Sequence, residues 1–541
     1  MVTSAGSPLS RVRAALPWLV PPVVVALAVV VIVSPGLMPD VGFWDTGEFQ
    51  TVAPILGTAH PTGYPTYVIL GFVVNVLLTP LGEPAFRMNV FSLLCVAVAA
   101  AATVRLVIRL TGSVPVAMAA GLGLALTPIA WAIATRADPH SLHLAFVGLL
   151  LAVLVRWEHG RRDGEPRADR WLVLAAATFG LSAGNHSLTL LLALPIGLYV
   201  LAVHPGIIRR PRLVAACAAV LVGSLVLVYL ELPLRAGPFR AELVYAKPET
   251  WDGFWYVALA EQFRGSLHDP LGELPRKLGD VASLAVTQFG LLAPAIVVAF
   301  IATAVRHPRY ALLTGSAMII TVLFNASYSN ADIQRYYLGP ALWAWTWLGI
   351  LGGAIVEGVS GRTWAVEAGA AAGAETDADA AVAAPGLPAG PLGALVPTVL
   401  AAVIGVVLLV PAVAEFDSRR LHADRSGDTA ARRWVTSALD QIEEGAVVVS
   451  WWSTSTTLWY AQYVDGLRRD LFVVDDRTRL DLGYGEATDV IARFYGTRPV
   501  YVIRANNHDL GLVLARYDLE PLPEGPATNV YRVLGPRGGS T

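Results

Sequence analysis

The residues best suited to chemistry lie in one stretch that follows the first apolar segment, residues 41–71. Asp45 and Glu48 are three positions apart, so they would share a face if this stretch is helical. A carboxylate at the rim of a bilayer can act as a general base toward a hydroxyl while a lipid-linked donor lies in the adjacent membrane. We therefore predict Asp45 as the catalytic base and Glu48 as the second choice. The alternative is an interfacial helix with a solvated acidic side.

Further polar residues lie at the ends of apolar segments, where polar groups near membrane depth are functional candidates. The predicted residues for binding a donor phosphate or substrate are His60, Arg87, Asn89, Arg136, Asp138, His140, Asn185, His186, Arg235, Arg335 and Tyr336. Each has a plainer interpretation. An arginine can hold a phosphate bidentately or only snorkel to the interface, and a tyrosine can be an interfacial anchor. His60 precedes a proline and could bond only a backbone group, and the Asn185-His186 pair could cap a helix turn.

Metal binding is a separate possibility for the same loops. Asp45, Glu48, His60, Asp138 and His140 offer nitrogen and oxygen ligands if the loops converge, but the chain contains no compact zinc spacing such as HExxH. We expect no obligatory cofactor, with a divalent metal as the alternative.

The composition is that of a multi-pass membrane protein. Of the 541 residues, 55% are apolar and 15% are charged, and the mean hydropathy is +0.56. The net charge of −2 and the lack of a basic stripe argue against a nucleic-acid partner. Cys95 and Cys217 both fall in apolar runs, which excludes a disulfide framework or a thiolate metal site.

Apolar segments of spanning length predict about 11 transmembrane helices. They cover residues 14–33, 90–110, 114–135, 142–155, 171–183, 187–203, 213–234, 283–305, 310–326, 336–356 and 392–413. Those that begin at Leu142 and Trp171 are short for a span.

The apolar run 64–81 decides the topology. If it lies along the membrane surface, the arginine clusters of the later loops fall in the cytoplasm, as the positive-inside rule requires. We therefore predict an interfacial or re-entrant helix, a cytoplasmic amino terminus, a catalytic first external loop (37–88), a long external loop (235–282) and a flexible cytoplasmic linker (358–390).

The composition changes after the last span, so we divide the chain into a transmembrane domain (1–414) and a soluble extracytoplasmic domain (415–541). Helical patterns that alternate with short β-branched runs predict a small parallel α/β sheet. No glycine-rich phosphate loop follows a strand, so a nucleotide-binding module is not expected. The predicted fold is an all-α polytopic membrane domain with external juxtamembrane helices and a small carboxyl-terminal α/β domain.

An ordered series of motifs carries a family resemblance. DTGEF, GTAHPTGYP, FRMNVFS, the turn at Asn185-His186, YLELPLRA, KPETWDGF and IQRYYLGP follow one another along the chain. Together they resemble the membrane glycosyltransferases of the C-type (GT-C) fold that use polyprenyl-phosphate sugars. They are most similar to bacterial relatives of the eukaryotic transmembrane protein O-mannosyltransferase that modifies plexin-type receptors. The carboxyl-terminal residues 443–475 also look like the tail of those relatives.

The resemblance implies an inverting transfer of a sugar, with mannose suggested by kinship, from a polyprenyl-phosphate donor. The acceptor would be a hydroxyl of a protein or cell-envelope glycan at the outer face of the bacterial cytoplasmic membrane. A transporter or flippase of a lipid-linked glycan is the alternative, although such proteins carry ionisable groups near the bilayer midplane and inverted repeats. A catalytically inactive scaffold is a third hypothesis. Substituting Asp45 by Asn would separate these functions.

Overall fold

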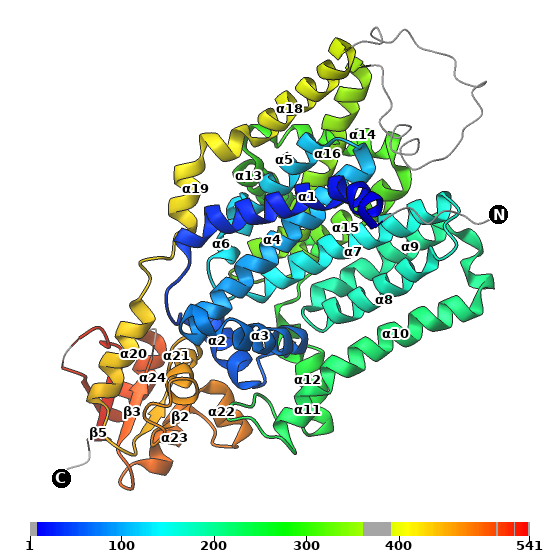
Figure 1. The fold of residues 1–541 in the computed structure, drawn as a ribbon. Helices are drawn as coiled ribbons and strands as arrows, with labels where there is room; N and C mark the ends of the chain where they lie inside the picture. The colour runs from blue at the N-terminus through cyan, green and yellow to red at the C-terminus, as the bar shows by residue number, and fades with distance from the viewer. Residues whose placement is uncertain (1–7, 361–390, 505–506, 524, 539–541) are drawn as a thin grey trace.

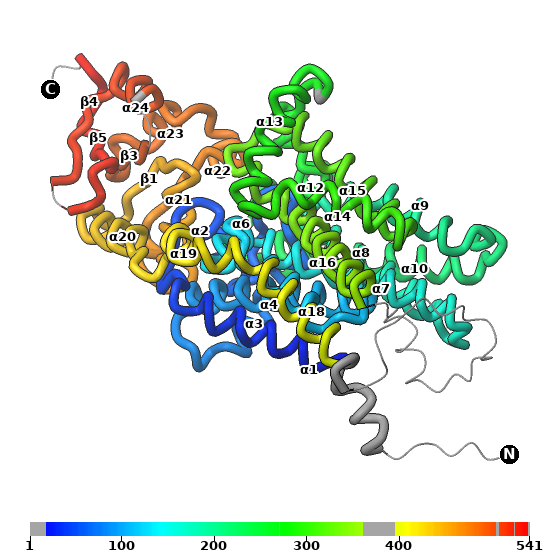
Figure 2. Tube along the Cα trace, turned by 90° about the horizontal axis from the view of Figure 1, so that it is seen from above, coloured from blue at the N-terminus to red at the C-terminus, as the bar shows by residue number. Residues whose placement is uncertain are grey.

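The computed structural model describes the backbone of residues 8–360, 391–504, 507–523 and 525–538. A large helical domain lies at one end and a small sheet domain at the other, as Figures 1 and 2 show from two directions. The α-helices of the large domain are α1 (Pro8–Val33), α2 (Trp44–Ile55), α3 (Pro65–Leu77), α4 (Pro84–Thr111), α5 (Val114–Ala125), α6 (Pro128–Ala134), α7 (Pro139–Arg162), α8 (Asp169–Ala183), α9 (Ala193–Val203), α10 (Pro211–Tyr229), α11 (Glu231–Ala236), α12 (Trp251–Ala258), α13 (Pro270–Phe289), α14 (Ala295–Arg306), α15 (Pro308–Ser327), α16 (Leu338–Ser360) and α18 (Pro391–Ala414). Short 3₁₀ helices join them, among them η3 (Ser187–Leu192), η5 (Glu261–Ser266) and η7 (Ile333–Tyr337).

Each predicted apolar segment falls on one of these helices or on a helix pair. Within the described residues, seven helices are long and apolar enough to cross a membrane, or up to nine if each of two bent pairs counts as one span. The bent pairs are α5 with α6, at 65°, and a pair ending in α14, at 83°. The other two predicted segments correspond to α8 and to η3 with α9, which are shorter. The helix at Leu142 is longer than its apolar run, because α7 includes polar residues at both ends.

Proline fixes where many of these helices begin. Helices α3, α4, α5, α6, α7, α10, α13 and α15 all have Pro at their first or second position. There its fixed φ angle suits the helix and its missing N–H costs nothing. The sequence therefore marks the breaks between apolar runs as well as the runs themselves.

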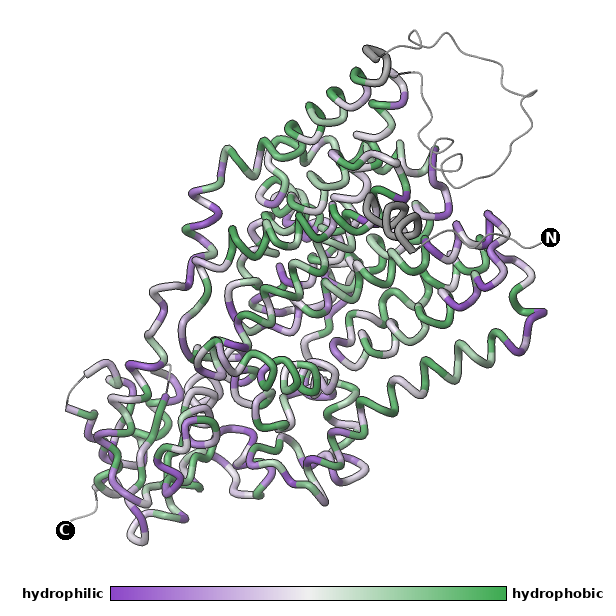
Figure 3. Tube along the Cα trace, in the orientation of Figure 1, coloured by the Kyte–Doolittle hydropathy of each residue, from purple (hydrophilic) through white to green (hydrophobic). Residues whose placement is uncertain are grey.

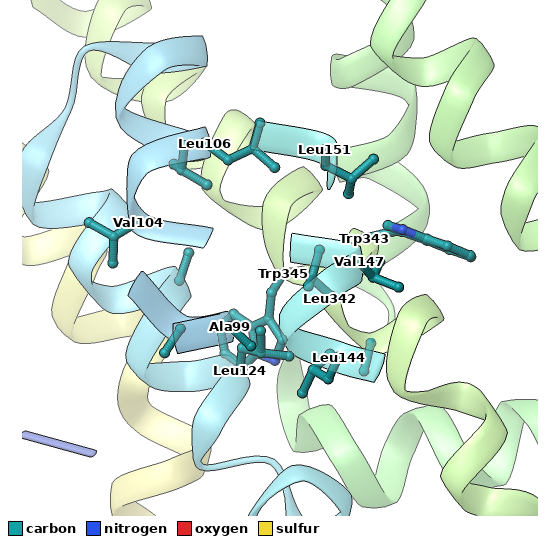
Figure 4. Packing of buried hydrophobic residues seen from close by; sticks show 14 of the residues in the cluster. Ala99, Val104, Leu106, Leu124, Leu144, Val147, Leu151, Leu342, Trp343 and Trp345 are labelled. Carbon is teal, nitrogen blue, oxygen red and sulfur yellow. The ribbon is translucent and has the colours of Figure 1, made fainter. Parts of the chain in front are cut away.

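The core of the large domain is apolar side chains from α4, α5, α7 and α16, which Figure 4 shows at close range. Trp343 and Trp345 are both almost fully buried there. A Cβ at Gly123 would collide with the ring of Trp345, so only glycine lets α5 and α16 approach this closely. Figure 3 shows that apolar residues dominate these helices, whereas the sheet domain is more mixed.

Helix α3 corresponds to the predicted interfacial helix. Its 13 residues reach about 20 Å at 1.5 Å per residue, short of the ~30 Å hydrocarbon core. Helix α2 lies between the long helices and the sheet domain (Figure 1), and α3 packs beside α2 and α4. The topology that follows from a non-spanning α3 stays a prediction. The predicted linker 358–390 lies, apart from the end of α16, outside the described residues.

The carboxyl-terminal part contains one sheet of five strands in the order β2-β1-β3-β5-β4. Its elements are α19 (Phe416–Ala423), α20 (Ala430–Gln441), β1 (Val447–Val449), α21 (Trp452–Tyr463), β2 (Phe472–Val474), α22 (Asp476–Asp481), α23 (Ala487–Phe494), β3 (Val500–Ile503), α24 (Asn507–Leu514), β4 (Tyr517–Pro521) and β5 (Val530–Pro536). The predicted parallel sheet is right for β1, β2 and β3. It is wrong for β4 and β5, which pair antiparallel. No helix separates these last two strands, so they form a hairpin and not a crossover unit.

The sheet domain is fixed to the loop before α2 by polar contacts. Arg432 on α20 donates to both carboxylate oxygens of Asp40 at 2.9–3.0 Å and also pairs with Asp465. Helix α21 packs directly on α2, and a Cβ at Gly47 would meet Oγ1 of Thr456 at 3.0 Å. The sheet domain therefore supports the helix that carries Asp45 and Glu48.

Candidate functional site

A cavity of about 530 Å³, lined by charged, aromatic and apolar side chains, lies where α2, the start of α7, η3, η5, η7 and α21 meet. We call it the chamber. Six of the predicted site residues line it: Asp45, His60, His140, His186, Arg335 and Tyr336. The chamber therefore draws on segments from nearly the whole length of the chain.

Asp45 reaches the chamber from the first turn of α2. At that position the helix dipole favours a negative charge. Its side chain is 37% exposed, and Oδ2 lies 3.7 Å from Nη2 of Arg335. Asp45 therefore faces the cavity as part of an ion pair.

Glu48 has a different environment although it shares the helix with Asp45. It is 1% exposed. Its Oε1 accepts from the backbone N–H of His60 at 2.8 Å, and its Oε2 bonds Nδ1 of the same residue. Burial raises the pKa of Glu48, against the opposing effect of His60. Burial would lower the pKa of His60, but Glu48 outweighs it and the pKa is raised. The predicted second base thus does not line the chamber and is bound to His60.

A second carboxylate–histidine pair stands at the amino end of α7. Asp138 caps the helix: its Oδ1 accepts from the backbone N–H of His140 and lies 2.9 Å from Nδ1 of the same ring. Its Oδ2 accepts from Nη1 of Arg335 at 3.1 Å. Burial alone would raise the pKa of Asp138, but Arg335 and His140 lower it well below its usual value. Arg335 also pairs with the exposed Asp332 at 2.7 Å.

Aromatic and imidazole rings form a continuous row along the chamber. The row runs from the sheet domain toward the long helices: Trp452 to His60 (5.6 Å between centroids), His60 to Tyr64 (5.2 Å), Tyr64 to His186 (5.6 Å) and His186 to His140 (4.6 Å). Consecutive rings are tilted or perpendicular, a favourable geometry for aromatic contacts. The two histidine pairs therefore lie toward opposite ends of one row.

An apolar cavity of about 600 Å³ adjoins the chamber. Four residues line both cavities: Ser187, Leu190, Ala258 and Leu259. The remaining wall comes mainly from α10 and α12. Only 6% of the most apolar stretch within Pro211–Ala236, which includes α10, is buried within the protein. The surface of this helix is therefore free to contact lipid. A hydrocarbon chain could enter here and leave its polar head in the chamber.

The other predicted residues do not line the chamber, and each has a role in the fold. Arg87 donates to the carbonyls of Gly82 and Asn75. Arg235 donates to the carbonyls of Leu56 and Ile55, at the end of α2. The amide of Asn89 bridges Gln50, Met38 and Ala137.

Two more predicted residues stand behind the chamber wall. Asn185 donates to the carbonyl of Pro139 at 3.1 Å, which joins the η3 turn to α7. Arg136 is mostly buried near Asp138, and burial lowers the pKa of Arg136. We therefore do not expect Asn185 or Arg136 to contact a ligand directly.

Sequence reasoning missed several lining residues, notably Tyr64, Tyr245, Phe263 and Trp452. Tyr64 stands within the GTAHPTGYP motif, so its neighbours offered a signal. Trp452 follows β1, and ligands of open α/β sheets bind beyond the carboxyl ends of parallel strands. That position was the available signal for Trp452.

Metal ligands do not converge at the site. In the part of the chain that the structure describes, no group of three or more His, Cys, Asp or Glu side chains could hold a metal ion. The acids and histidines instead satisfy one another as pairs.

Comparisons with known proteins show what this chain resembles in sequence and in fold. Residues 45–206 match the family described as the protein O-mannosyl-transferase TMEM260 N-terminal domain. The mouse protein O-mannosyl-transferase TMEM260 is 31% identical over 231 residues, which are 40% of this chain and 31% of the relative. The match thus spans about a third of the length of that relative.

The fold agrees over nearly the whole chain. The structure of ArnT from Cupriavidus metallidurans bound to undecaprenyl phosphate superposes with a TM-score of 0.59 at 18% identity, covering 96% of this chain and 98% of that one. The apo oligosaccharyltransferase of Archaeoglobus fulgidus gives 0.52 at 14% identity, covering 93% and 73%. The chain therefore has the fold of these two solved structures, and its residues 45–206 are similar to the TMEM260 N-terminal domain. The GT-C fold predicted from the motifs is confirmed, and this GT-C protein is a multi-pass membrane protein.

Proposed function

We propose that this GT-C protein transfers a sugar, mannose by kinship, from a polyprenyl-phosphate donor to a hydroxyl of a protein or cell-envelope glycan. The observation that carries the proposal is the pairing of two cavities. A chamber lined by an arginine, carboxylates and histidines adjoins an apolar cavity beside a lipid-facing helix. The likeness to a solved structure that holds undecaprenyl phosphate and the TMEM260 match support the same class of reaction.

The donor would lie across the shared wall of the two cavities. Its isoprenoid chain would occupy the apolar cavity, and its phosphate would lie near Arg335 and His140. Arginine suits this task because its planar fork matches phosphate oxygens. Asp332, whose side chain is 61% exposed, is the partner of Arg335 that a phosphate displaces at least cost. Asp138 would keep the guanidinium in place.

The reaction would invert the anomeric carbon. The acceptor hydroxyl attacks that carbon, a base in the chamber takes the hydroxyl proton, and the lipid phosphate departs with its charge stabilised by Arg335. Asp45 is the base predicted from the sequence. We propose that no metal is obligatory, which dialysis against EDTA before the assay tests directly.

The site would face the outside of a bacterial cytoplasmic membrane, with a cytoplasmic amino terminus and an extracytoplasmic sheet domain. The positive-inside distribution of arginines supports this orientation. Labelling of single cysteines introduced at exposed Arg433 and at exposed Arg162 in intact cells would test it, since only the first should react.

The deciding experiment incubates purified protein with a panel of radiolabelled polyprenyl-phosphate sugars and membrane extract, and identifies the labelled product. Ala258→Trp would narrow the passage between the cavities, so transfer from a long-chain donor should fall more than transfer from a short-chain one. Val222→Trp is the matched control, because Val222 is exposed on α10 and lies outside the cavity lining. No transfer with any donor would reject the proposal. Movement of labelled lipid across vesicles without transfer would replace it with a transporter.

A further inference from the structure

We propose that the proton acceptor for the attacking hydroxyl is His60, oriented by Glu48, and not either carboxylate of α2. The inference rests on the proposed transfer reaction and deepens it. It changes the roles that the sequence suggests for Asp45 and Glu48, and it separates an acceptor end from a donor end of the chamber.

The geometry of the Glu48–His60 pair leaves one ring nitrogen available. Both oxygens of Glu48 are occupied by His60, one by its backbone N–H and one by Nδ1. The backbone N–H can only donate, so it favours the ionised carboxylate. Nδ1 then carries the proton, and Nε2 is the basic atom. Nε2 has one weak partner, the hydroxyl of Tyr64 at 3.4 Å, and both residues line the chamber.

Neither carboxylate of α2 is as well placed to receive a proton. Glu48 is 1% exposed, does not line the chamber, and has both oxygens engaged. Asp45 does line it, but its carboxylate pairs with Arg335. A neighbouring guanidinium stabilises the ionised form of a carboxylate and weakens it as a base. The arrangement thus has the form of a carboxylate–histidine dyad, in which the acid orients the ring and stabilises the imidazolium.

His60 also lies at the end of the chamber where an acceptor would enter. The apolar cavity meets the chamber at Ser187 and Leu190, next to His186 in sequence, and at Ala258 and Leu259, at the end of α12. His60 instead contacts the rings of Trp452 and Phe263, from the sheet domain and the long external loop. Those two rings line the chamber but not the apolar cavity. A hydroxyl that arrives past Trp452 would meet Nε2 of His60 before it meets the donor.

The proton and electron pairs then balance in one displacement. The acceptor oxygen forms a bond to the anomeric carbon while its proton moves to Nε2 of His60. The bond between the anomeric carbon and the phosphate oxygen breaks, and its electron pair stays on the phosphate. Glu48 stabilises the imidazolium, which later releases its proton to water in the open chamber.

A pH profile reports on this assignment because the rate requires neutral His60. The charged or titratable groups that face the ring are Glu48 and Asp45 on α2, Tyr64 before α3 and Arg335 on η7. Glu48 and Asp45 raise the pKa of His60, whereas burial and Arg335 lower it. The rate should therefore rise with pH through an ascending limb, and Glu48→Gln should move that limb to lower pH.

The experiment measures transfer from pH 5 to 9 for the wild type, His60→Ala, Glu48→Gln and Asp45→Asn, with His422→Gln as an exposed control. We expect His60→Ala to lose about 10²–10⁴-fold in kcat, the usual worth of a general base, and to regain part of it with added imidazole. Asp45→Asn should be slower but keep the ascending limb. Binding of polyprenyl phosphate by each variant shows that it is folded.

Two results would overturn the inference. One is an ascending limb that persists in His60→Ala, and the other is a limb that disappears in Asp45→Asn while His60→Ala keeps its rate. Both presuppose transfer by the wild-type protein in the same assay. A wild type that transfers nothing rejects the proposed function itself, so the two failures are distinct.

Discussion

The two carboxylate–histidine pairs of the chamber use the same chemistry in different surroundings. Glu48 serves His60 alone and is otherwise enclosed. Asp138 divides its oxygens between His140 and Arg335. The first pair contacts Trp452 of the sheet domain, whereas the second lies beside His186, next to the wall shared with the apolar cavity.

In our proposal, the partner of the carboxylate determines the role of the histidine. With only an acid behind it, His60 is prepared to accept a proton. With an arginine on the same acid, His140 belongs to a cationic group suited to a phosphate. The Nε2 atom of His140 is buried and has no partner, so a phosphate oxygen that reached it would satisfy it.

Arg335 should show the largest effect, because it pairs with three acids, Asp45, Asp138 and Asp332. Arg335→Gln removes ion pairs with Asp45, Asp138 and Asp332, so the buried carboxylate of Asp138 keeps its bonds to His140 but loses its guanidinium partner. We expect transfer to fall by roughly 10³-fold or more and stability to fall by about 3–5 kcal/mol. Product formation and thermal melting measure these losses. Arg276→Gln, an exposed pair on α13, is the control, and equal losses in both variants would contradict the assignment.

Substituting the two acids should separate binding from chemistry. Asp138→Asn frees the guanidinium that would hold the phosphate, so KM for the donor should rise by about 10–100-fold with a smaller change in kcat. Glu48→Gln should instead lower kcat by about 10–100-fold and leave donor affinity nearly unchanged. Steady-state kinetics with varied donor at saturating acceptor measure both. If the two variants share one pattern, the division into donor and acceptor ends fails.

The sequence predicted the helical fold and the polar breaks well, because both are local. A run of apolar residues with proline at its start specifies a membrane helix without regard to distant segments. Asp45, His60 and Arg335 interrupt or flank such runs, so their polarity alone made them candidates.

Sequence spacing alone did not predict which of those candidates line the chamber and which only stabilise the fold. Arg87 and Arg235, like Arg335, are arginines next to apolar runs. Their guanidinium groups nevertheless bind backbone carbonyls. Asp45 and Glu48 were predicted as the first and second choice of base because they share a helix face. Burial separates them, and burial depends on what packs against α2. That packing comes partly from α21, hundreds of residues away in sequence.

Loosening the sheet domain should affect the acceptor end more than the donor end. Arg432→Ala removes the charged hydrogen bonds to Asp40 and Asp465, at a cost of about 1.5–3 kcal/mol per bond to a charged group. We expect a lower melting temperature and a several-fold higher KM for the acceptor, with an unchanged KM for the donor. Arg433→Ala, the exposed neighbour, should do neither. If only the KM for the donor changed, Trp452 would belong to the donor end of the chamber, and our assignment of it to the acceptor end would be wrong.

The smallest expected effect is on the pH dependence of stability. It distinguishes the two carboxylate–histidine pairs without an activity assay. The pKa of His60 is raised by Glu48, so its stabilising contribution is complete below the unfolded value of about 6.5 and fades as pH rises through the folded pKa. The difference in melting temperature between the wild type and Glu48→Gln should therefore shrink as pH rises.

Asp138 should behave in the opposite way. Its lowered pKa gives a contribution that is present above the unfolded value of about 3.9 and is lost only when pH falls through the lower folded pKa. The melting difference between the wild type and Asp138→Asn should therefore stay flat from pH 5 to 9, while that of Glu48→Gln slopes. Melting curves of the three detergent-solubilised proteins across this range measure both differences. Parallel slopes would mean that the two acids hold their histidines in the same way, and the contrast between the ends of the chamber would then have no electrostatic basis.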